Sequence, residues 1–556
     1  MKIVTCLVLL AIVAVVRADF YMHNPRGSNN RLSEDNNNRN NANRLFDSQN
    51  NNRGGYNVGD SNTAKNGNGR GDGTGILTYY KTSILRVEWT NQHGGENPNV
   101  NTQVVFQYMC DDQSATYVDS NSVTQELWNT DLLRDGDGSI GNAANQRVQD
   151  DTQTQRGRHE PIAFYQHCST RNRNRGLFIA TENIADNASA RRTRQDNAGT
   201  QYGSECPEER DYYPYWHPTP WKDIIVLTSN MTQCELYQTE SQNVMAKGFC
   251  VDQQHNNRDD CIDDGSQWYE VAPWGIPAPR CEPLAFSRDN HLGNSIGGEP
   301  LHFNWTIPSE VTNDAKCVLR GRYNISTDDY DGWNQFYEED EDGDVISPIT
   351  DDPNVNLLKG TGRAAGVQLN VDVSQFGRTF QDRSHTFIIK DRPADIPAEA
   401  KIYNLNVRGR RGNIVQVYPA VEYDFIPREL VVTPTDYVHI AWTGSLSSPD
   451  GAGQGAANSD KNNLVCTASA GHSVPLTFAD EACNLFTTFA QHENFATAGV
   501  GGATIDELLN NAPATYDGGL IQPGGGQVGD YYFLNTRNNH FSNRSQRGSI
   551  KVVASV

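Results

Sequence analysis

Beyond its first eighteen residues, the chain has no apolar run long enough to cross a bilayer, and the common catalytic signatures are missing as well. No GxSxG nucleophile elbow, HExxH zinc motif or phosphate-binding glycine loop occurs in a plausible context. Helical periodicity is also scarce, and only residues 123–133 and 505–511 have the pattern of a short helix. The sequence therefore predicts no catalytic residue, and an enzyme is the less favoured interpretation.

The first 18 residues predict a secretory signal peptide. A single early Lys2 precedes an apolar run over residues 3–16, and small or β-branched side chains precede the expected cleavage after Ala18. Cys6 would leave with this segment, so ten of the 11 cysteines would remain. An even number is expected of a chain oxidised on the secretory route. The cysteines that we expect to form disulfides are Cys110, Cys168, Cys206, Cys234, Cys250, Cys261, Cys281, Cys317, Cys466 and Cys483.

Within this set, Cys466 and Cys483 stand apart near the C-terminus, and we expect them to pair with each other. The loop that they close is short, and such a crosslink stabilises a fold by roughly 3 kcal/mol. The other eight cysteines lie in the first part of the chain, and their pairing stays open because eight thiols permit about 105 connectivities.

N-glycosylation acceptors fit the same secretory route. They are Asn187, Asn230, Asn304, Asn324 and Asn543. Loss of Lys2 and Arg17 with the signal peptide would lower the formal charge from −22 to −24, and such a polyanion is repelled by nucleic acid and anionic lipid. We therefore expect a secreted, extracellular protein whose partner is a protein or a glycan, with no nucleic-acid binding and no membrane insertion. The sequence does not set the oligomeric state.

Period-two alternation of apolar residues dominates the chain from residue 76 onward. Strands are predicted at 80–89, 104–109, 177–180, 224–227, 301–305, 317–323, 386–390, 402–407, 530–535 and 548–553, separated by Gly-, Asp- and Pro-rich turns. Residues 430–442 are predicted to form two strands joined at a Pro-Thr-Asp turn. A chain of this length is too long for one core. The pattern predicts an all-β fold, a disulfide-bonded, multi-domain β-sandwich with long irregular loops.

Composition shifts suggest the domain limits. We expect the signal peptide at 1–18, an Asn/Arg/Gly-rich arm at 19–75, a Cys-rich β domain at 76–335, an acidic junction at 336–355, a middle β segment at 356–418 and a final β-sandwich at 419–556. The arm has few apolar anchors, and it is interpreted either as a disordered segment or as an ordered polar loop lying on a domain.

The final unit resembles a cupredoxin, in which a strand ending in a metal ligand enters a short loop before the closing strand. A blue-copper site needs a thiolate, two imidazoles and usually a weak thioether. Here Asn535 stands near the position of the thiolate, and no methionine follows Met245. We therefore exclude a type 1 copper centre and expect no cofactor. A copper site built from histidines is kept as an alternative, and its candidate ligands are His439, His472, His492 and His540.

Other candidate sites have plain structural alternatives. Residues 206–221 gather aromatic side chains among prolines, which suits either a sugar-binding face or a small core, and we favour the core. Acidic clusters at 135–138, 328–331 and 338–344 could collect Ca²⁺, but none has EF-hand spacing and a solvated loop is favoured. His23 would be the fifth mature residue, so an N-terminal copper ligand of the polysaccharide monooxygenase kind is not expected.

Several longer blocks resemble the secreted DD3-3 family. They lie at 21–32, 40–50, 89–93, 206–221, 287–294, 376–385 and 537–544, so the likeness covers nearly the whole mature length. The resemblance implies a secreted glycoprotein and carries no catalytic residues across. The leading interpretation is a non-enzymatic binding or matrix component, and the alternative is a secreted copper enzyme with a histidine site that acts on polysaccharide.

Overall fold

The structure, a computed structural model, describes part of the chain. The described residues are 20–27, 76–91, 101–130, 209, 213–252, 255, 257–284, 300–326, 338–339, 345–346, 354–368, 380–409, 423–444, 461–480, 483–504, 507–508, 511–537 and 546–554.

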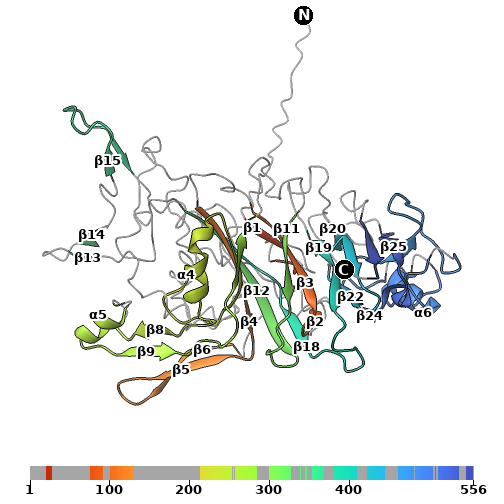
Figure 1. The fold of residues 1–556 in the computed structure, drawn as a ribbon, viewed down its shortest axis with the longest axis horizontal. Coiled ribbons are helices and arrows are strands. Elements are labelled where there is room, and N and C mark those ends of the chain that lie inside the picture. The colour runs from red at the N-terminus through yellow and green to blue at the C-terminus, as the bar shows by residue number, and fades with distance from the viewer. Residues whose placement is uncertain are drawn as a thin grey trace, which may run out of the picture.

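One seven-stranded sheet runs through the middle of the molecule (Figure 1). Its main path joins β1 (Phe20–Asn24), β3 (Ile84–Asn91), β19 (Ile402–Gly409), β22 (Tyr437–Trp442) and β24 (Tyr516–Ile521). In addition, β11 (Leu301–Thr306) pairs with β3, and β20 (Tyr423–Ile426) pairs with β19. Strands from the two ends of the chain therefore share one hydrogen-bonded sheet.

A second seven-stranded sheet packs against the N-terminal half of the first. It contains β10 (Arg280–Pro283), β7 (Lys222–Thr228), β4 (Asn101–Cys110), β12 (Ala315–Ser326), β18 (Phe387–Lys390) and β2 (Leu77–Tyr80), with β17 (Phe380–Arg383) on β12. Side chains of both sheets meet in one core, where the Phe106 ring lies 4.8 Å from Trp89 and 6.0 Å from Phe20. The period-two pattern explains this burial, because alternate residues of β11 are buried and exposed.

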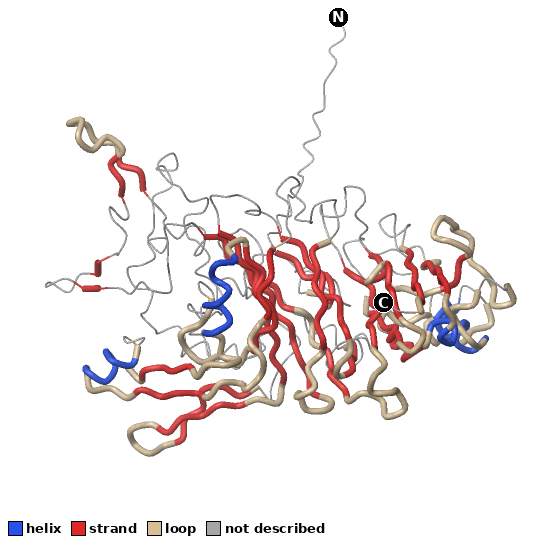
Figure 2. The backbone as a smooth tube through the Cα atoms, in the orientation of Figure 1, coloured by secondary structure: helices blue, strands red, loops and turns tan. Residues whose placement is uncertain are grey.

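The C-terminal part forms a second sandwich. A four-stranded sheet of β21 (Glu429–Val432), β26 (Arg547–Val552), β25 (Gly529–Leu534) and β23 (Val465–Thr467) faces the β19–β22–β24 end of the central sheet. The core between them includes Trp442, Phe425 and Phe533, which are fully buried. The described chain is thus mostly strands in sheets, as the sequence predicted (Figure 2).

Short elements complete the described fold. Two hairpins, β5 (Ser114–Val118) with β6 (Thr124–Asn129) and β8 (Lys247–Cys250) with β9 (Trp268–Val271), lie beside the second sheet. Two further pairs are β13 (Glu338–Glu339) with β14 (Val345–Ile346), and β15 (Asn354–Asn356) with β16 (Gly366–Gln368). The α-helices are α4 (Cys234–Thr239), α5 (Arg258–Asp263) and α6 (Phe489–Thr497), and short 3₁₀ turns are η7 (Met231–Gln233) and η11 (Pro523–Gly526).

The helix predicted at residues 123–133 is wrong. Residues 124–129 form strand β6, which pairs with β5 across a turn held by Asp119. The Asp119 carboxylate accepts hydrogen bonds from the backbone N–H groups of Asn121 and Val123. This local capping favours a hairpin over a helix.

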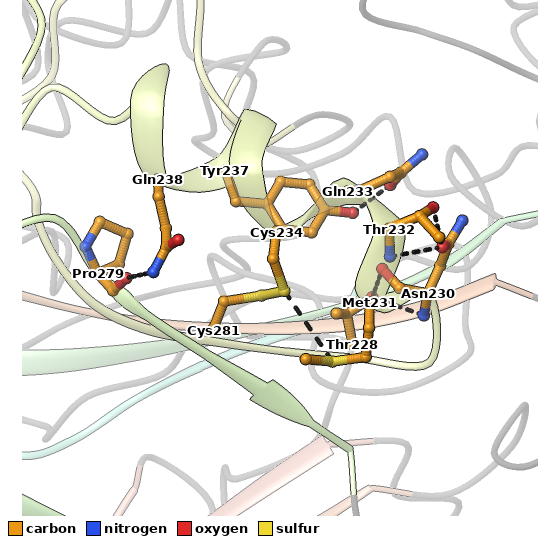
Figure 3. The surroundings of a disulfide bond; sticks show 10 residues. All are labelled: Thr228, Asn230, Met231, Thr232, Gln233, Cys234, Tyr237, Gln238, Pro279 and Cys281. Carbon is orange, nitrogen blue, oxygen red and sulfur yellow. Dashed lines mark hydrogen bonds between the residues drawn. A yellow bond between two sulfur atoms is a disulfide. The ribbon is translucent and has the colours of Figure 1, made fainter.

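Four disulfides crosslink described residues. They are Cys110–Cys317, Cys234–Cys281, Cys250–Cys261 and Cys466–Cys483. The first joins two residues that face each other in neighbouring strands β4 and β12, and the second ties α4 to β10 (Figure 3). Cys168 and Cys206 lie outside the described residues.

Within the described segments, no helix combines the length and the apolar character needed to pass through a bilayer.

The core between the two large sheets depends on the N-terminal strand. Phe20 of β1 has no exposed surface, so Phe20→Ala should lower the free energy of unfolding by about 3–5 kcal/mol through lost burial and a cavity. Phe489→Ala is the matched control, because the Phe489 side chain is 59% exposed, and its effect should stay within about 0.5 kcal/mol. Equal effects of the two changes in denaturant unfolding would contradict this placement of β1.

Candidate functional site

The position at which a cupredoxin holds its thiolate is filled by side-chain amides. Asn535 directly follows β25, and its Nδ2 donates hydrogen bonds to Asn462 Oδ1 at 3.0 Å and to Gln546 Oε1 at 2.8 Å. Gln546 Nε2 in turn donates to Asn462 Oδ1 at 3.1 Å. Asn462 and Gln546 are buried. This three-residue group, here called the amide cluster, ties the two ends of the 535–546 loop to the segment before β23.

Asn463, the residue after Asn462, also ties this segment to the end of β25 and to α6. Asn463 Oδ1 accepts from the Thr536 backbone N–H at 2.9 Å, and Asn463 Nδ2 donates to Thr536 Oγ1 at 2.7 Å and to the Ala496 carbonyl at 2.9 Å. As metal ligands, neutral amide oxygens are hard and weak, whereas a type 1 copper ion needs a thiolate ligand. The described residues at this position therefore fit hydrogen bonding and not blue copper.

The candidate histidine ligands do not form one described group. His439 lies in the central sheet, His472 is exposed on the loop after β23, and His492 lies on α6. His540 lies outside the described residues. His23 is part of β1, where its ring nitrogens contact the Gly409 carbonyl at 2.9 Å and Thr90 Oγ1 at 2.7 Å.

Across the described segments, two groups of three metal-ligating side chains have donor atoms within 4.8 Å of one another. The first is Cys466, Cys483 and His492, of which Cys466 lies close to Asn462 of the amide cluster in the sequence. Its two sulfur atoms are bonded to each other, so they are not available as thiolates. Burial lowers the pKa of His492, whose ring stacks on Phe486 at 5.8 Å. This group therefore packs as part of the core.

The second group contains Asp252, His255 and Asp264, at the edge of the β8–β9 hairpin. His255 Nε2 lies 2.9 Å from Asp264 Oδ2. The sequence analysis does not predict this group, since Asp252 and Asp264 belong to none of the acidic clusters that stand out in the sequence. The available signal was a histidine three residues after an aspartate, in a segment that also contains Cys250 and Cys261.

His439 forms a buried network at the junction of N-terminal and C-terminal strands. Asn404 Nδ2 donates to Ser83 Oγ at 2.9 Å and to the Ile84 carbonyl at 3.0 Å, so Asn404 Oδ1 faces His439 Nδ1 at 3.1 Å. His439 Nδ1 must then carry a proton. His439 Nε2 lies 2.9 Å from the Asp517 carboxylate.

Both ring nitrogens of His439 therefore face acceptor oxygens. Burial alone would raise the pKa of Asp517, but hydrogen bonds from His439 and from the Gly519 N–H, together with the nearby His439 and Lys390 side chains, outweigh burial and lower this pKa. The order Asp–His–Asn–Ser does not make a catalytic triad, because Ser83 is fully buried and contacts Asn404 rather than His439.

The described aromatic residues of the 206–221 block belong to a core, as the sequence favoured. Tyr213, Tyr215 and Trp221 are buried. The Trp221 ring lies between two buried guanidinium groups, 4.0 Å from that of Arg320 and 4.7 Å from that of Arg383. Arg320 also pairs with the Glu209 carboxylate at 2.7 Å. Tyr215 and Trp221 therefore contact buried cations and pack as part of the interior.

The acidic segments considered for Ca²⁺ are largely beyond the described residues. Residues 135–138 and 328–331 lie outside them, and of 338–344 only strand β13 is described.

Three predicted glycosylation acceptors are described, and their surroundings differ. Asn304 is exposed on β11. Asn230 is half-buried at the start of η7, where its Oδ1 accepts from the backbone N–H and the hydroxyl of Thr232 (Figure 3). Asn324 is only 7% exposed, and its Nδ2 donates to Gln103 Oε1 at 3.0 Å. Asn187 and Asn543 lie outside the described residues.

Comparison with known proteins identifies two family models on this chain. The DD3-3 N-terminal domain matches residues 18–389, and the DD3-3 cupredoxin-like domain matches residues 400–505 and 502–552. No curated protein and no solved structure gives a significant match.

The His439–Asp517 pair should make stability depend on pH. The lowered pKa of Asp517 means that its contribution is present at neutral pH and is lost as the carboxylate is protonated in acid. Asp517→Asn should cost about 1 kcal/mol at pH 7, a modest value because the carboxylate is 44% exposed and partly screened. The difference from wild type should shrink between about pH 5 and pH 3.

The matched control is Asp530→Asn, which removes the same charge from an exposed position of β25. Chemical unfolding across this pH range should show no comparable loss for the control. A penalty for Asp517→Asn that stays constant from pH 7 to pH 3 would contradict the charged pair.

Proposed function

Because the chain belongs to the DD3-3 family, we propose that it is a secreted extracellular glycoprotein that binds a protein or a glycan and catalyses no reaction. The predicted signal peptide at 1–18 and the five glycosylation acceptors support export. The four described disulfides support an oxidising compartment. The formal charge of −22 suits partners with basic surfaces.

The observation that carries the non-enzymatic part of the proposal is the amide cluster. Asn535, Asn462 and Gln546 hydrogen-bond to one another near the position where the resemblance to a cupredoxin would put the copper thiolate. A domain closed by internal hydrogen bonds contributes a rigid scaffold, and binding then falls to the loops that the scaffold displays.

The experiment compares binding with copper chemistry on the untagged full chain purified from a secreting host. We expect binding to a glycan array or to extracellular proteins that survives chelation, and no oxidised sugar products when polysaccharide, copper and a reductant are supplied. Two results together would overturn the proposal in favour of the copper enzyme. One is the formation of oxidised sugar products, and the other is stoichiometric copper that is lost in His540→Ala but kept in Asp264→Asn.

Glycan occupancy gives a separate test of export and of the described acceptor geometry. Asn230 and Asn304 should carry glycans, because Asn304 is exposed and the Asn230–Thr232 pair lies at the surface. Asn324 should be unmodified in the folded protein, because its amide is buried against Gln103.

Enzymatic deglycosylation in heavy-oxygen water followed by peptide mass spectrometry measures each position. Asn230→Gln and Asn304→Gln should each remove one glycan, whereas Asn324→Gln should remove none. A glycan found on Asn324 of folded, secreted protein would contradict this packing of β12.

A further inference from the structure

The β8–β9 hairpin and α5 form a small disulfide-closed unit at one end of the molecule. Figure 1 places this unit at the far side of the N-terminal domain from α6 and β25. It contains the second group of metal-ligating side chains, Asp252, His255 and Asp264. The unit is therefore separate from the amide cluster and from the His439 network.

The donor atoms of these three residues are arranged for one ion. They lie within 4.8 Å of one another, and the shortest described separation is the 2.9 Å between His255 Nε2 and Asp264 Oδ2. A tetrahedral ion with bonds of about 2.1 Å holds its ligands about 3.4 Å apart. The 4.8 Å limit on their separations is close to this spacing, and the three side chains are exposed or half-buried, so they have room to rotate toward an ion.

The backbone that carries the three donors is already tied together. The Cys250–Cys261 disulfide joins the segment of Asp252 to α5. The Asp252 backbone N–H donates to Ser266 Oγ at 3.0 Å, and the His255 N–H donates to the Asp252 carbonyl at 3.2 Å.

On the other side, Asp264 is held at the C-terminal end of α5. Its N–H donates to the Asp260 carbonyl at 3.1 Å, and the Ser266 N–H donates to the Cys261 carbonyl at 2.9 Å. Ser266 thus connects the segment of Asp252 to the end of the helix. A site whose backbone is fixed before binding loses little conformational entropy when the ion arrives.

The donor chemistry selects the class of ion. An imidazole nitrogen with two carboxylate oxygens suits borderline divalent ions such as Zn²⁺, whereas Ca²⁺ takes all-oxygen sets. Further acidic side chains on α5, Asp259 and Asp260 in its first turn and Asp263 in its last, are exposed and make the local field favourable to cations.

From these observations we propose that Asp252, His255 and Asp264 form a binding site for a divalent transition-metal ion of the Zn²⁺ class. The three side chains leave at least one coordination position for water or for a group of a partner. This proposal does not rest on the proposed function, since the site lies away from the cupredoxin-like domain.

The test is isothermal titration of the full chain, with its disulfides intact, with Zn²⁺ alone. Wild type should bind one equivalent at a saturable site, and Ca²⁺ should not compete for it. Asp264→Asn should weaken this binding at least roughly tenfold, because even the loss of an outer-shell partner of a metal ligand costs about 10–100-fold. His255→Gln should have the same effect, since it removes the nitrogen donor.

Asp263→Asn is the matched control. It removes the same charge from the neighbouring residue, which is not one of the three donors, and it should change the affinity less than about twofold. Circular dichroism and the intact disulfide mass establish that each variant is folded. The proposal fails if wild type shows no saturable Zn²⁺ site, if Asp263→Asn weakens binding as much as Asp264→Asn, or if Ca²⁺ displaces Zn²⁺ at equal concentration.

Discussion

The structure depends on strand β3, which is hydrogen-bonded along both of its edges. One edge pairs with β11, and the other meets β1 and, at Ile84, the parallel strand β19 of the C-terminal part. Two buried side chains cross this junction, because Glu88 of β3 and Arg408 of β19 form an ion pair at 3.2 Å and are 1% and 8% exposed. Removing one partner of such a pair would leave an uncompensated buried charge at the junction between strands of the two family domains.

The C-terminal sandwich shows how a cupredoxin-like domain remains closed without soft ligands. Asn535 and Gln546 stand at the two ends of the last loop and share Asn462 as a common acceptor. Asn462 Oδ1 accepts two hydrogen bonds and Gln546 both donates and accepts one, whereas Asn462 Nδ2 is buried without a partner among the described residues. The aromatic core around Trp442 and Phe533 supplies the apolar burial that stabilises this sandwich.

The sequence located many of the strands but left the pairing of most of them open. Alternation located β4, β7, β11 and β12 because it is a local property of each segment. By contrast, the predicted strand at 80–89 is divided by a turn in which Thr82 has a φ of 64°. Residues 430–442 do form two strands, but β21 and β22 enter opposite sheets, which only non-local contacts decide.

The contrast between local patterns and non-local contacts also separates the candidate sites that the sequence indicates from those that it does not. Asn535 was recognised as a missing thiolate from its place before the closing strand, which is a short-range pattern. The group of Asp252, His255 and Asp264 was missed because its third member reaches the others only through the fold around the Cys250–Cys261 crosslink. The hydrogen-bond partners of Asn535 lie up to 73 residues away in the sequence and could not be read from it.

In the described part of the chain, more basic than acidic side chains are buried, which leaves its surface more acidic than the composition of the same residues. Among the described residues, nine lysines and arginines are buried but only six aspartates and glutamates are. The buried Arg320 pairs with Glu209 and stacks on the Trp221 ring, and the buried Arg408 pairs with Glu88. Because these basic side chains are buried, the remaining exposed side chains of the described residues have a larger excess of carboxylates. A surface of this sign attracts divalent cations and basic partners at long range, whichever loops make the specific contacts.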